Sequence, residues 1–184
     1  MENHRLVKIS KYLSKHLRHQ PERIGIKISS GGWVAVDELL AACSNHSFPI
    51  TRDELNEVVA TNDKKRFSFD STGKLIRANQ GHSIDVDLQL QTQIPPDVLY
   101  HGTGANAVES ILNTGICQMS RHHVHLSTNI ETAKTVGKRH GIPVVFAVDA
   151  ARMYQDEFKF YCSDNGVWLV ELVPPEYLQK SEKN

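Results

Sequence analysis

Hydrophobic residues in the first half of the chain follow first a helical and then a strand-like spacing. Between residues 6 and 17 they recur every three or four positions, which predicts an amphipathic helix over residues 5–19 that Pro21 ends. Residues 33–36 fit a short strand, and Asp37 is the predicted N-cap of a second helix.

Thr51 and Glu54 have the spacing of a capping box, which predicts the start of a third helix. Two strand-like runs follow, residues 66–69 and 74–77, and the turn at 70–73 joins them as a hairpin. Short helices followed by a hairpin are typical of a winged-helix lobe.

The second half mixes strands with short helices, which is typical of an α+β lobe. A polar segment from about residue 80 to the Pro95-Pro96 pair separates the two halves and is interpreted as a linker. Predicted strands cover residues 98–100, 124–127, 143–148, 158–161 and 167–170, with one helix around 108–112 closed by Gly115 and another capped by Thr128 with Glu131.

Composition restricts the class of protein. The chain has 184 residues, of which 40% are hydrophobic and 23% are charged, so a disordered chain is excluded. No apolar run approaches the ~18 residues of a membrane span, and the polar N-terminus lacks a signal-peptide core. The widely spaced cysteines Cys43, Cys117 and Cys162 indicate a reducing, cytoplasmic location without disulfides or a zinc ribbon.

Charge is balanced overall, with 21 basic and 21 acidic residues, but it is unevenly distributed. Basic residues concentrate within residues 1–19 and at Lys64-Lys65-Arg66. These clusters are either ordinary solvated surface or a local site for an anion. The zero net charge disfavours an extended surface that binds many phosphates, but it is compatible with a compact phosphate-binding surface.

Some short groups of residues could take part in binding or catalysis. Arg18-His19 combines a planar guanidinium that matches phosphate oxygens with a ring that can carry a proton, although cations at a helix C-terminus also have a structural role. Arg66 alternates with Phe67, so it lies on the opposite face from that expected core residue. The polar segment 78–83, taken alone, is a loop.

His101-Gly102-Thr103 follows a strand and suggests a nucleotide contact. A glycine lets a ligand approach the backbone, whose N–H and C=O can bind an amide such as nicotinamide. Several histidines occur within residues 122–125, but no nearby cysteine or paired carboxylate completes a metal shell, so we expect no metal. The chain lacks P-loop, GxGxxG and GxSxG motifs.

In their order, these pieces closely resemble the RNA 2′-phosphotransferase family, often called tRNA 2′-phosphotransferase. The resemblance spans nearly the whole chain, and its specificity comes from the joint order of short motifs. The matching segments are Ser10–His19, Gly31–Trp33, Asp63–Phe67, Ile76–Ser83, Leu99–Thr103, Arg121–Ser127, Gly137–Gly141 and Asn165–Leu169.

The resemblance implies an α+β protein of two lobes. The first is a winged-helix, RNA-binding lobe at residues 1–90, and the second is an ADP-ribosyltransferase-like, NAD-binding lobe at residues 95–184.

The resemblance also implies a reaction, the removal of an internal 2′-phosphate from RNA, with NAD+ as co-substrate and no metal. The RNA 2′-phosphate would attack the nicotinamide ribose to give RNA-2′-phospho-ADP-ribose. The ribose 2″-OH would then attack that phosphate, giving 2′-OH RNA and ADP-ribose 1″,2″-cyclic phosphate.

The family's functional residues map onto this chain by motif. The resemblance places the catalytic set on Arg18, His19, Arg66 and Arg121. It places NAD+ contacts on His101, Gly102, Thr103, His125 and Ser127. His82, Arg139 and His140 also match family motifs, without an assigned role.

Two other functions stay open at this point. One is an ADP-ribosyltransferase that caps terminal phosphates of RNA or DNA and stops after the first step. The other is a non-enzymatic winged-helix binder of nucleic acid. The physiological RNA is not specified by the sequence, and we expect a monomer.

Overall fold

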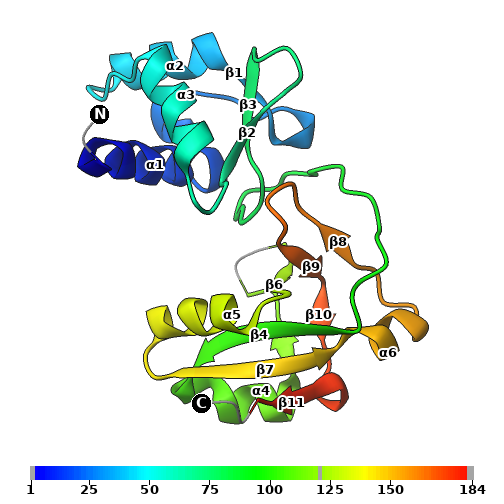
Figure 1. Ribbon diagram of the computed structural model, residues 1–184. Coiled ribbons are helices and arrows are strands. Elements are labelled where there is room, and N and C mark those ends of the chain that lie inside the picture. The colour runs from blue at the N-terminus through cyan, green and yellow to red at the C-terminus, as the bar shows by residue number, and fades with distance from the viewer. Residues whose placement is uncertain (1–2, 120–121, 182–184) are drawn as a thin grey trace. The chain divides into compact units, whose positions relative to one another are not determined.

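The computed structural model describes residues 3–119 and 122–181. The chain divides into two compact units, Met1–Gln89 and Leu90–Asn184, and each contains its own cluster of buried hydrophobic side chains. Helices and small antiparallel sheets occur in both units, which confirms the α+β class (Figure 1). No helix within the described ranges is long and apolar enough to cross a membrane.

The N-terminal unit places helices on one side of a three-stranded antiparallel sheet of order β1-β3-β2 (Figure 1). β2 and β3 form the expected hairpin, with Phe67 opposite Ala78. The elements are α1 (Asn3–Arg18), η1 (Pro21–Ile24), η2 (Ser30–Gly32), β1 (Val34–Ala35), α2 (Val36–Asn45), α3 (Arg52–Thr61), β2 (Phe67–Phe69) and β3 (Leu75–Ala78).

Helix α1 supplies much of the core of this unit. Ile9, Leu13 and Leu17 lie on its inward face and are fully buried. Burial stabilises each such side chain by roughly 1.5–3 kcal/mol relative to exposure. Because the helix ends at Arg18, the exposed His19 follows directly after its last residue.

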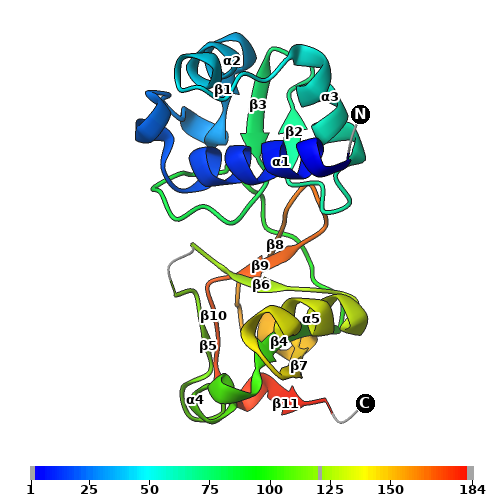
Figure 2. The same ribbon diagram turned by 90° about the vertical axis from the view of Figure 1, so that its left-hand side faces the viewer.

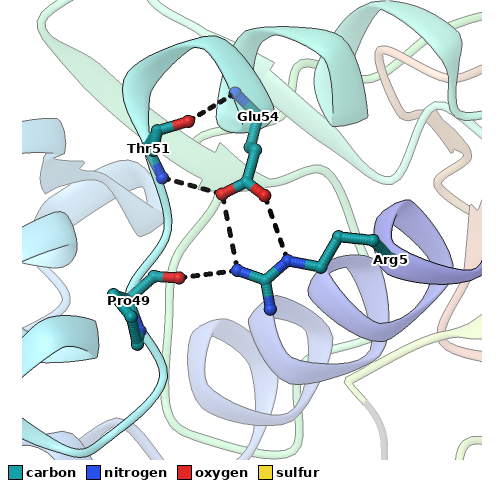
Figure 3. Close-up of polar contacts among 4 residues, drawn as sticks. All are labelled: Arg5, Pro49, Thr51 and Glu54. Carbon is teal, nitrogen blue, oxygen red and sulfur yellow. Dashed lines mark hydrogen bonds and ion pairs between the residues drawn. The ribbon is translucent and has the colours of Figure 1, made fainter. Parts of the chain in front are cut away.

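The predicted capping box at the start of α3 is confirmed and extends to α1 (Figure 3). The Thr51 backbone N–H donates to Glu54 Oε2 at 2.9 Å, and the Glu54 N–H donates to Thr51 Oγ1 at 3.2 Å. Arg5 Nε donates to Glu54 Oε1 at 3.0 Å, and Arg5 Nη2 donates to the Pro49 carbonyl. The bond from Arg5 is the main reason that the pKa of Glu54 lies below its usual range.

Two predicted N-caps are wrong by one or two residues. Helix α2 has Ala35 at the N-cap because β1 pairs with β3 up to Ala35 and runs straight into the helix, so Asp37 falls in the first turn. Helix α5 has Asn129 at the N-cap in place of Thr128, since its side chain accepts from the N–H groups of Glu131 and Thr132.

The C-terminal unit contains three antiparallel sheets, of orders β11-β7-β4, β6-β9-β8 and β10-β5. Strands β8 and β9 pair as a hairpin, and the strand predicted over residues 158–161 starts only at Tyr161. The elements are β4 (Val98–Gly104), η3 (Ala105–Ala107), α4 (Val108–Thr114), β5 (Ile116–Cys117), β6 (Val124–Leu126), α5 (Ile130–Gly137), η4 (Lys138–His140), β7 (Pro143–Asp149), α6 (Ala150–Gln155), β8 (Tyr161–Cys162), β9 (Trp168–Val170), β10 (Leu172–Val173), η5 (Pro175–Tyr177) and β11 (Leu178–Lys180).

Strand β4 is longer than the sequence predicts. It pairs with β7 from Val98 to Gly104, so His101-Gly102-Thr103 lies inside the strand and not in a loop after it. Helix α5 lies against β4 in both views (Figures 1 and 2). A Cβ on Gly102 would lie 1.6 Å from the Ala133 carbonyl oxygen of α5. The glycine is therefore required for helix and strand to approach this closely.

The segment predicted as a linker is held by hydrogen bonds to each unit in turn. The Gly31 N–H donates to the Asp87 carbonyl in the N-terminal unit at 2.9 Å. The Gln93 N–H donates to the Phe160 carbonyl in the C-terminal unit at 2.8 Å. Its polar composition therefore does not make it a free spacer.

Candidate functional site

Arg18 and His19 lie where α1 ends and a later segment crosses it. The Arg18 carbonyl accepts from the backbone N–H groups of Ser83 and Ile84 at 2.9 and 3.4 Å. These bonds supply a helix-end carbonyl with the partners that it lacks within the helix. The Ser83 hydroxyl also lies 2.8 Å from His19 Nδ1. The end of α1 is thus fixed by residues more than 60 positions away.

Arg66 is tied to α1 through a buried serine. Ser10 is 4% exposed, and its hydroxyl oxygen accepts from Asn62 Nδ2 at 2.9 Å and from Arg66 Nη1 at 3.3 Å. Asn62 is the C-cap of α3, so the hydroxyl joins the first helix, the third helix and the residue before β2. This contact restrains a long side chain that would otherwise sample many rotamers.

The backbone before Arg66 is held from the other side by Asn79. Asn79 Nδ2 donates to the Lys65 carbonyl, and the Asn79 N–H donates to the Arg66 carbonyl at 2.9 Å. Lys65 has a φ of 41°, a left-handed conformation that non-glycine residues rarely adopt. The surrounding bonds stabilise this tight turn and fix the point from which Arg66 leaves it.

Alternate residues of the segment 79–83 therefore contact three residues that the resemblance assigns to catalysis. Asn79 binds the Arg66 backbone, Gly81 lies against the Arg18 guanidinium, and Ser83 contacts His19. A Cβ on Gly81 would be 3.6 Å from Arg18 Nη1. Four residue steps cover at most about 14 Å of extended chain, so these contacts are gathered within one small region of the N-terminal unit.

In the C-terminal unit, β4 directs its residues to two faces. Gly102 faces α5, while Leu99, His101 and Thr103 alternate to the opposite face, where Leu99 is fully buried and Thr103 is 8% exposed. The space beside the Gly102 Cα is filled by helix α5. Any ligand contact at Gly102 must consequently use its peptide groups.

The peptide groups of Gly102 point to an edge of the sheet. Tyr100 exchanges two backbone hydrogen bonds of 2.8 Å with Ser127, which lies on the side of β4 away from β7. In an antiparallel ladder the peptide groups of every second residue point the same way. The N–H and C=O of Gly102 therefore point toward the edge that carries Ser127, and they could pair with a primary amide.

His101 is held as a neutral ring with a defined tautomer. Burial lowers its pKa, and the nearby His140 lowers it further, against the smaller opposing effect of its hydrogen bond to the His125 carbonyl. Because a carbonyl only accepts, Nδ1 must carry the proton that it donates to the His125 oxygen at 3.1 Å. In the neutral ring Nε2 is then an acceptor, which suits a hydroxyl group.

The other residues assigned to NAD+ differ in what they can offer. His125 lies in β6, where its backbone carbonyl holds His101. The Ser127 hydroxyl donates to the Asn129 carbonyl at 3.0 Å and accepts from the Asn129 N–H at 3.1 Å. This hydroxyl therefore shapes the start of α5.

Arg121, the fourth residue of the predicted catalytic set, lies outside the described residues. Within residues 3–119 and 122–181, no group of three or more His, Cys, Asp or Glu side chains could hold a metal ion. His82 is buried at 2% exposure beside Gly32, whereas Arg139 and His140 are exposed in η4.

Sequence reasoning assigned no role to the residues that hold this site together, although Ser10, Asn79 and Ser83 lie in segments that match the family. Local patterns do not single out Ser10, Asn62, Asn79 or Ser83, and segment 78–83 taken alone indicates only a loop. The available signal was a polar stretch interrupted by Gly81, which has a φ of 87°. Its partners are distant in sequence, so local patterns could not identify them.

Comparison with known proteins adds an independent line of evidence. A sequence model described as "RNA 2'-phosphotransferase, Tpt1 / KptA family" matches residues 4–172. A protein of Nostoc punctiforme named probable RNA 2'-phosphotransferase is 69% identical over 180 residues, covering 98% of this chain and 99% of that protein. Proteins with the same name from Trichormus variabilis and Streptomyces coelicolor are 67% and 57% identical, each covering 97% of this chain and 98% and 97% of their own lengths.

Proposed function

The chain belongs to the RNA 2′-phosphotransferase, Tpt1 / KptA family of transferases, and we propose that it transfers an internal RNA 2′-phosphate to NAD+. The proposed products are nicotinamide, RNA with a free 2′-OH, and ADP-ribose 1″,2″-cyclic phosphate. The proposed lobes are a winged-helix, RNA-binding N-terminal unit and an ADP-ribosyltransferase-like, NAD-binding C-terminal unit.

The reaction is proposed to run in two steps. The 2′-phosphate of the RNA forms a bond to C1″ of the nicotinamide ribose, and the bond from C1″ to nicotinamide breaks. The 2″-OH of the same ribose then loses its proton and forms a bond to the phosphorus, while the bond from phosphorus to the RNA 2′-oxygen breaks and that oxygen takes up a proton. The substrate itself supplies the nucleophile, so the first step depends chiefly on positioning. The second step develops charge on phosphate oxygens, which cationic donors stabilise.

Residues of the N-terminal unit support its proposed role toward the RNA 2′-phosphate. Arg18 and Arg66 offer guanidinium groups that match phosphate oxygens, and His19 can donate or receive a proton. Their contacts along residues 79–83 restrain them within one region of this unit. Arg121 completes the proposed set by its motif alone.

Strand β4 supports a role in binding NAD+. The Gly102 N–H and C=O are complementary to the nicotinamide carboxamide, which has one acceptor oxygen and an NH2 donor. His101 Nε2 offers an acceptor for a ribose hydroxyl, and Thr103 lies on the same face of the strand. We propose His125 and Ser127 as further contacts. When bound, NAD+ supplies an electrophilic ribose carbon with a good leaving group.

The single observation that carries the proposal is the alternation along segment 79–83. Three successive odd-numbered residues contact Arg66, Arg18 and His19, in a chain whose family transfers RNA 2′-phosphates. A non-enzymatic binder of nucleic acid has no need for the NAD+ contacts proposed on β4.

The decisive assay combines the full chain with NAD+ and an RNA that carries one internal 2′-phosphate, without added metal. We expect loss of the 2′-phosphate together with release of nicotinamide and the cyclic phosphate, and no reaction with the matched 2′-OH RNA. A 2′-phosphate that persists after full incubation would refute the proposal. An ADP-ribosylated RNA that never resolves would instead support a capping ADP-ribosyltransferase.

A further inference from the structure

The Ser83 hydroxyl contacts His19, while separate backbone hydrogen bonds hold Ser83 itself in place. Its N–H donates to the Arg18 carbonyl at 2.9 Å, and the next N–H donates to the same oxygen at 3.4 Å. The position of the Ser83 Cα relative to the end of α1 is consequently set by the backbone. The hydroxyl, 2.8 Å from His19 Nδ1, is available to fix the ring.

The location of His19 makes this hydrogen bond useful. The residue follows the last residue of α1 and is exposed, so its ring is not packed into the hydrophobic core. A hydrogen bond at one ring nitrogen determines which nitrogen carries the proton and how the ring is oriented. A fixed orientation is an advantage in catalysis.

We propose that Ser83 is a positioning residue for His19. By engaging Nδ1, the hydroxyl directs Nε2 toward the 2′-phosphate of the RNA. The proposal rests on the proposed function, since it assigns His19 to that phosphate. Ser83 itself does not touch substrate in this scheme.

A serine hydroxyl suits this position because its oxygen can accept a hydrogen bond from Nδ1–H. When the ring is positively charged, both nitrogens carry a proton and the hydroxyl accepts from Nδ1–H. When Nε2 gives up its proton, Nδ1 keeps its own and the same hydrogen bond remains. His19 can therefore pass a proton at Nε2 without breaking the contact that orients it. In metal sites, the group that hydrogen-bonds to the second nitrogen of a ligating histidine has the same role, because it fixes the orientation and tautomer of the ring.

Kinetics of two variants provide the first test. Ser83→Ala removes only the hydroxyl and retains the backbone bonds, whereas Ser83→Thr retains the hydroxyl on an exposed residue. We expect Ser83→Ala to lower the single-turnover rate of 2′-phosphate removal about tenfold, with an unchanged KM for NAD+. We expect Ser83→Thr to retain most of the rate. Ser71→Ala, at an exposed serine in the β2–β3 turn, is the matched control.

Nitrogen NMR of the imidazole provides a readout that does not depend on activity. At a pH well above the ordinary pKa of histidine, a hydrogen-bonded ring gives well-separated 15N shifts for its two nitrogens. We expect the His19 separation to shrink in Ser83→Ala and to return in Ser83→Thr.

The rate and the NMR shifts together distinguish failure of the positioning role from failure of the proposed function. An unchanged rate or unchanged His19 shifts in Ser83→Ala would overturn the positioning role. So would an equal loss of rate in Ser83→Thr and Ser83→Ala. If the shifts change as expected but the unmodified protein does not remove a 2′-phosphate, the contact stands and the proposed function fails.

Discussion

The two units hold their candidate functional groups by different means. In the N-terminal unit, long or exposed side chains are restrained by small polar residues from other elements, as Ser10 restrains Arg66 and Ser83 contacts His19. In the C-terminal unit, the peptide groups of β4 are the candidate contacts, and the packing of α5 on Gly102 sets their position. Removing a single polar side chain should therefore disturb the first set of groups, whereas a change in helix packing should disturb the second.

The largest effect should follow from Gly102→Ala. A Cβ at this position would lie 1.6 Å from a backbone oxygen of α5, which cannot move without displacing the helix. We expect the free energy of unfolding to fall by about 3 kcal/mol or more, together with loss of NAD+ binding. Thermal unfolding followed by circular dichroism measures the first effect, and calorimetric titration measures the second.

Gly166→Ala is the matched control for that substitution. Gly166 has a φ of 79°, but a Cβ added there would meet no atom within 4 Å, so only backbone strain of about 1 kcal/mol is expected. If Gly102→Ala were no less stable than Gly166→Ala, the packing of α5 would not be what requires the glycine.

A smaller effect, mainly on rate, should follow from Ser10→Ala. Without the hydroxyl, Arg66 loses its contact with α1 and the Asn62 amide loses its acceptor. We expect the rate of 2′-phosphate removal to fall about tenfold and the free energy of unfolding to fall by about 1–3 kcal/mol. Ser14→Ala, one turn further along α1, should change neither quantity.

A double-mutant cycle with Arg66→Ala tests whether Ser10 acts through Arg66. We expect Arg66→Ala to slow the second step more than the first, and Ser10→Ala to add little further loss of rate in that background. Additive losses of rate would mean that Ser10 acts on something other than Arg66.

Arg5→Ala should affect stability alone. Arg5 bonds to Glu54 and to the Pro49 carbonyl, and its side chain is 34% exposed. We expect a loss of about 1 kcal/mol that salt reduces, with an unchanged rate. Lys8→Ala removes the same charge from an exposed position of α1 and should leave stability unchanged.

The pH dependence of this effect has a definite sign. The pKa of Glu54 is lowered in the folded chain, so the contribution of the pair is present above the ordinary pKa of glutamate and is lost as pH falls through the folded value. The stability difference between the original chain and Arg5→Ala should therefore shrink in acid. A difference that stayed constant would show that Arg5 acts through packing on Phe48 instead.

The smallest effect concerns the histidine of β4. Because burial lowers the pKa of His101, the unfolded chain takes up this proton first as pH falls below about 6.5, and the folded chain loses stability down to its own lower pKa. Protonation also converts Nε2 from an acceptor to a donor, so affinity for NAD+ should fall as pH drops through the lower pKa of the folded chain. Chemical unfolding and NAD+ titration at several pH values, compared with His101→Asn, measure both. An equally steep pH dependence in His101→Asn would contradict this assignment.

Local patterns predicted the elements that local chemistry stabilises. The capping box of Thr51 and Glu54 and the β2–β3 hairpin depend on residues a few positions apart, and both were predicted correctly. The N-cap of α2 was wrong because a strand pairing, invisible in the local sequence, carries the chain directly into the helix.

The candidate site was predictable only in part, for the same physical reason. The positions of Arg18, His19 and Arg66 came from motifs, but Ser10 is 56 positions away from Arg66 and Ser83 is 64 positions away from His19. The sequence likewise suggested that Gly102 leaves room for a ligand, whereas that room is filled by α5. Such contacts depend on the tertiary fold and leave no periodic signal.

The alternating contacts of segment 79–83 have a consequence for how this stretch can vary in length. The backbone of this segment turns at Gly81, whose φ is 87°, and Asn79, Gly81 and Ser83 each meet a different residue. One inserted or deleted residue between Asn79 and Ser83 would therefore displace at least one of the contacts with Arg66, Arg18 and His19. No substitution could repair such a shift, because the backbone itself supplies several of the contacts. The spacing from the hairpin to the end of α1 is therefore as strict a requirement as the identity of any residue within it.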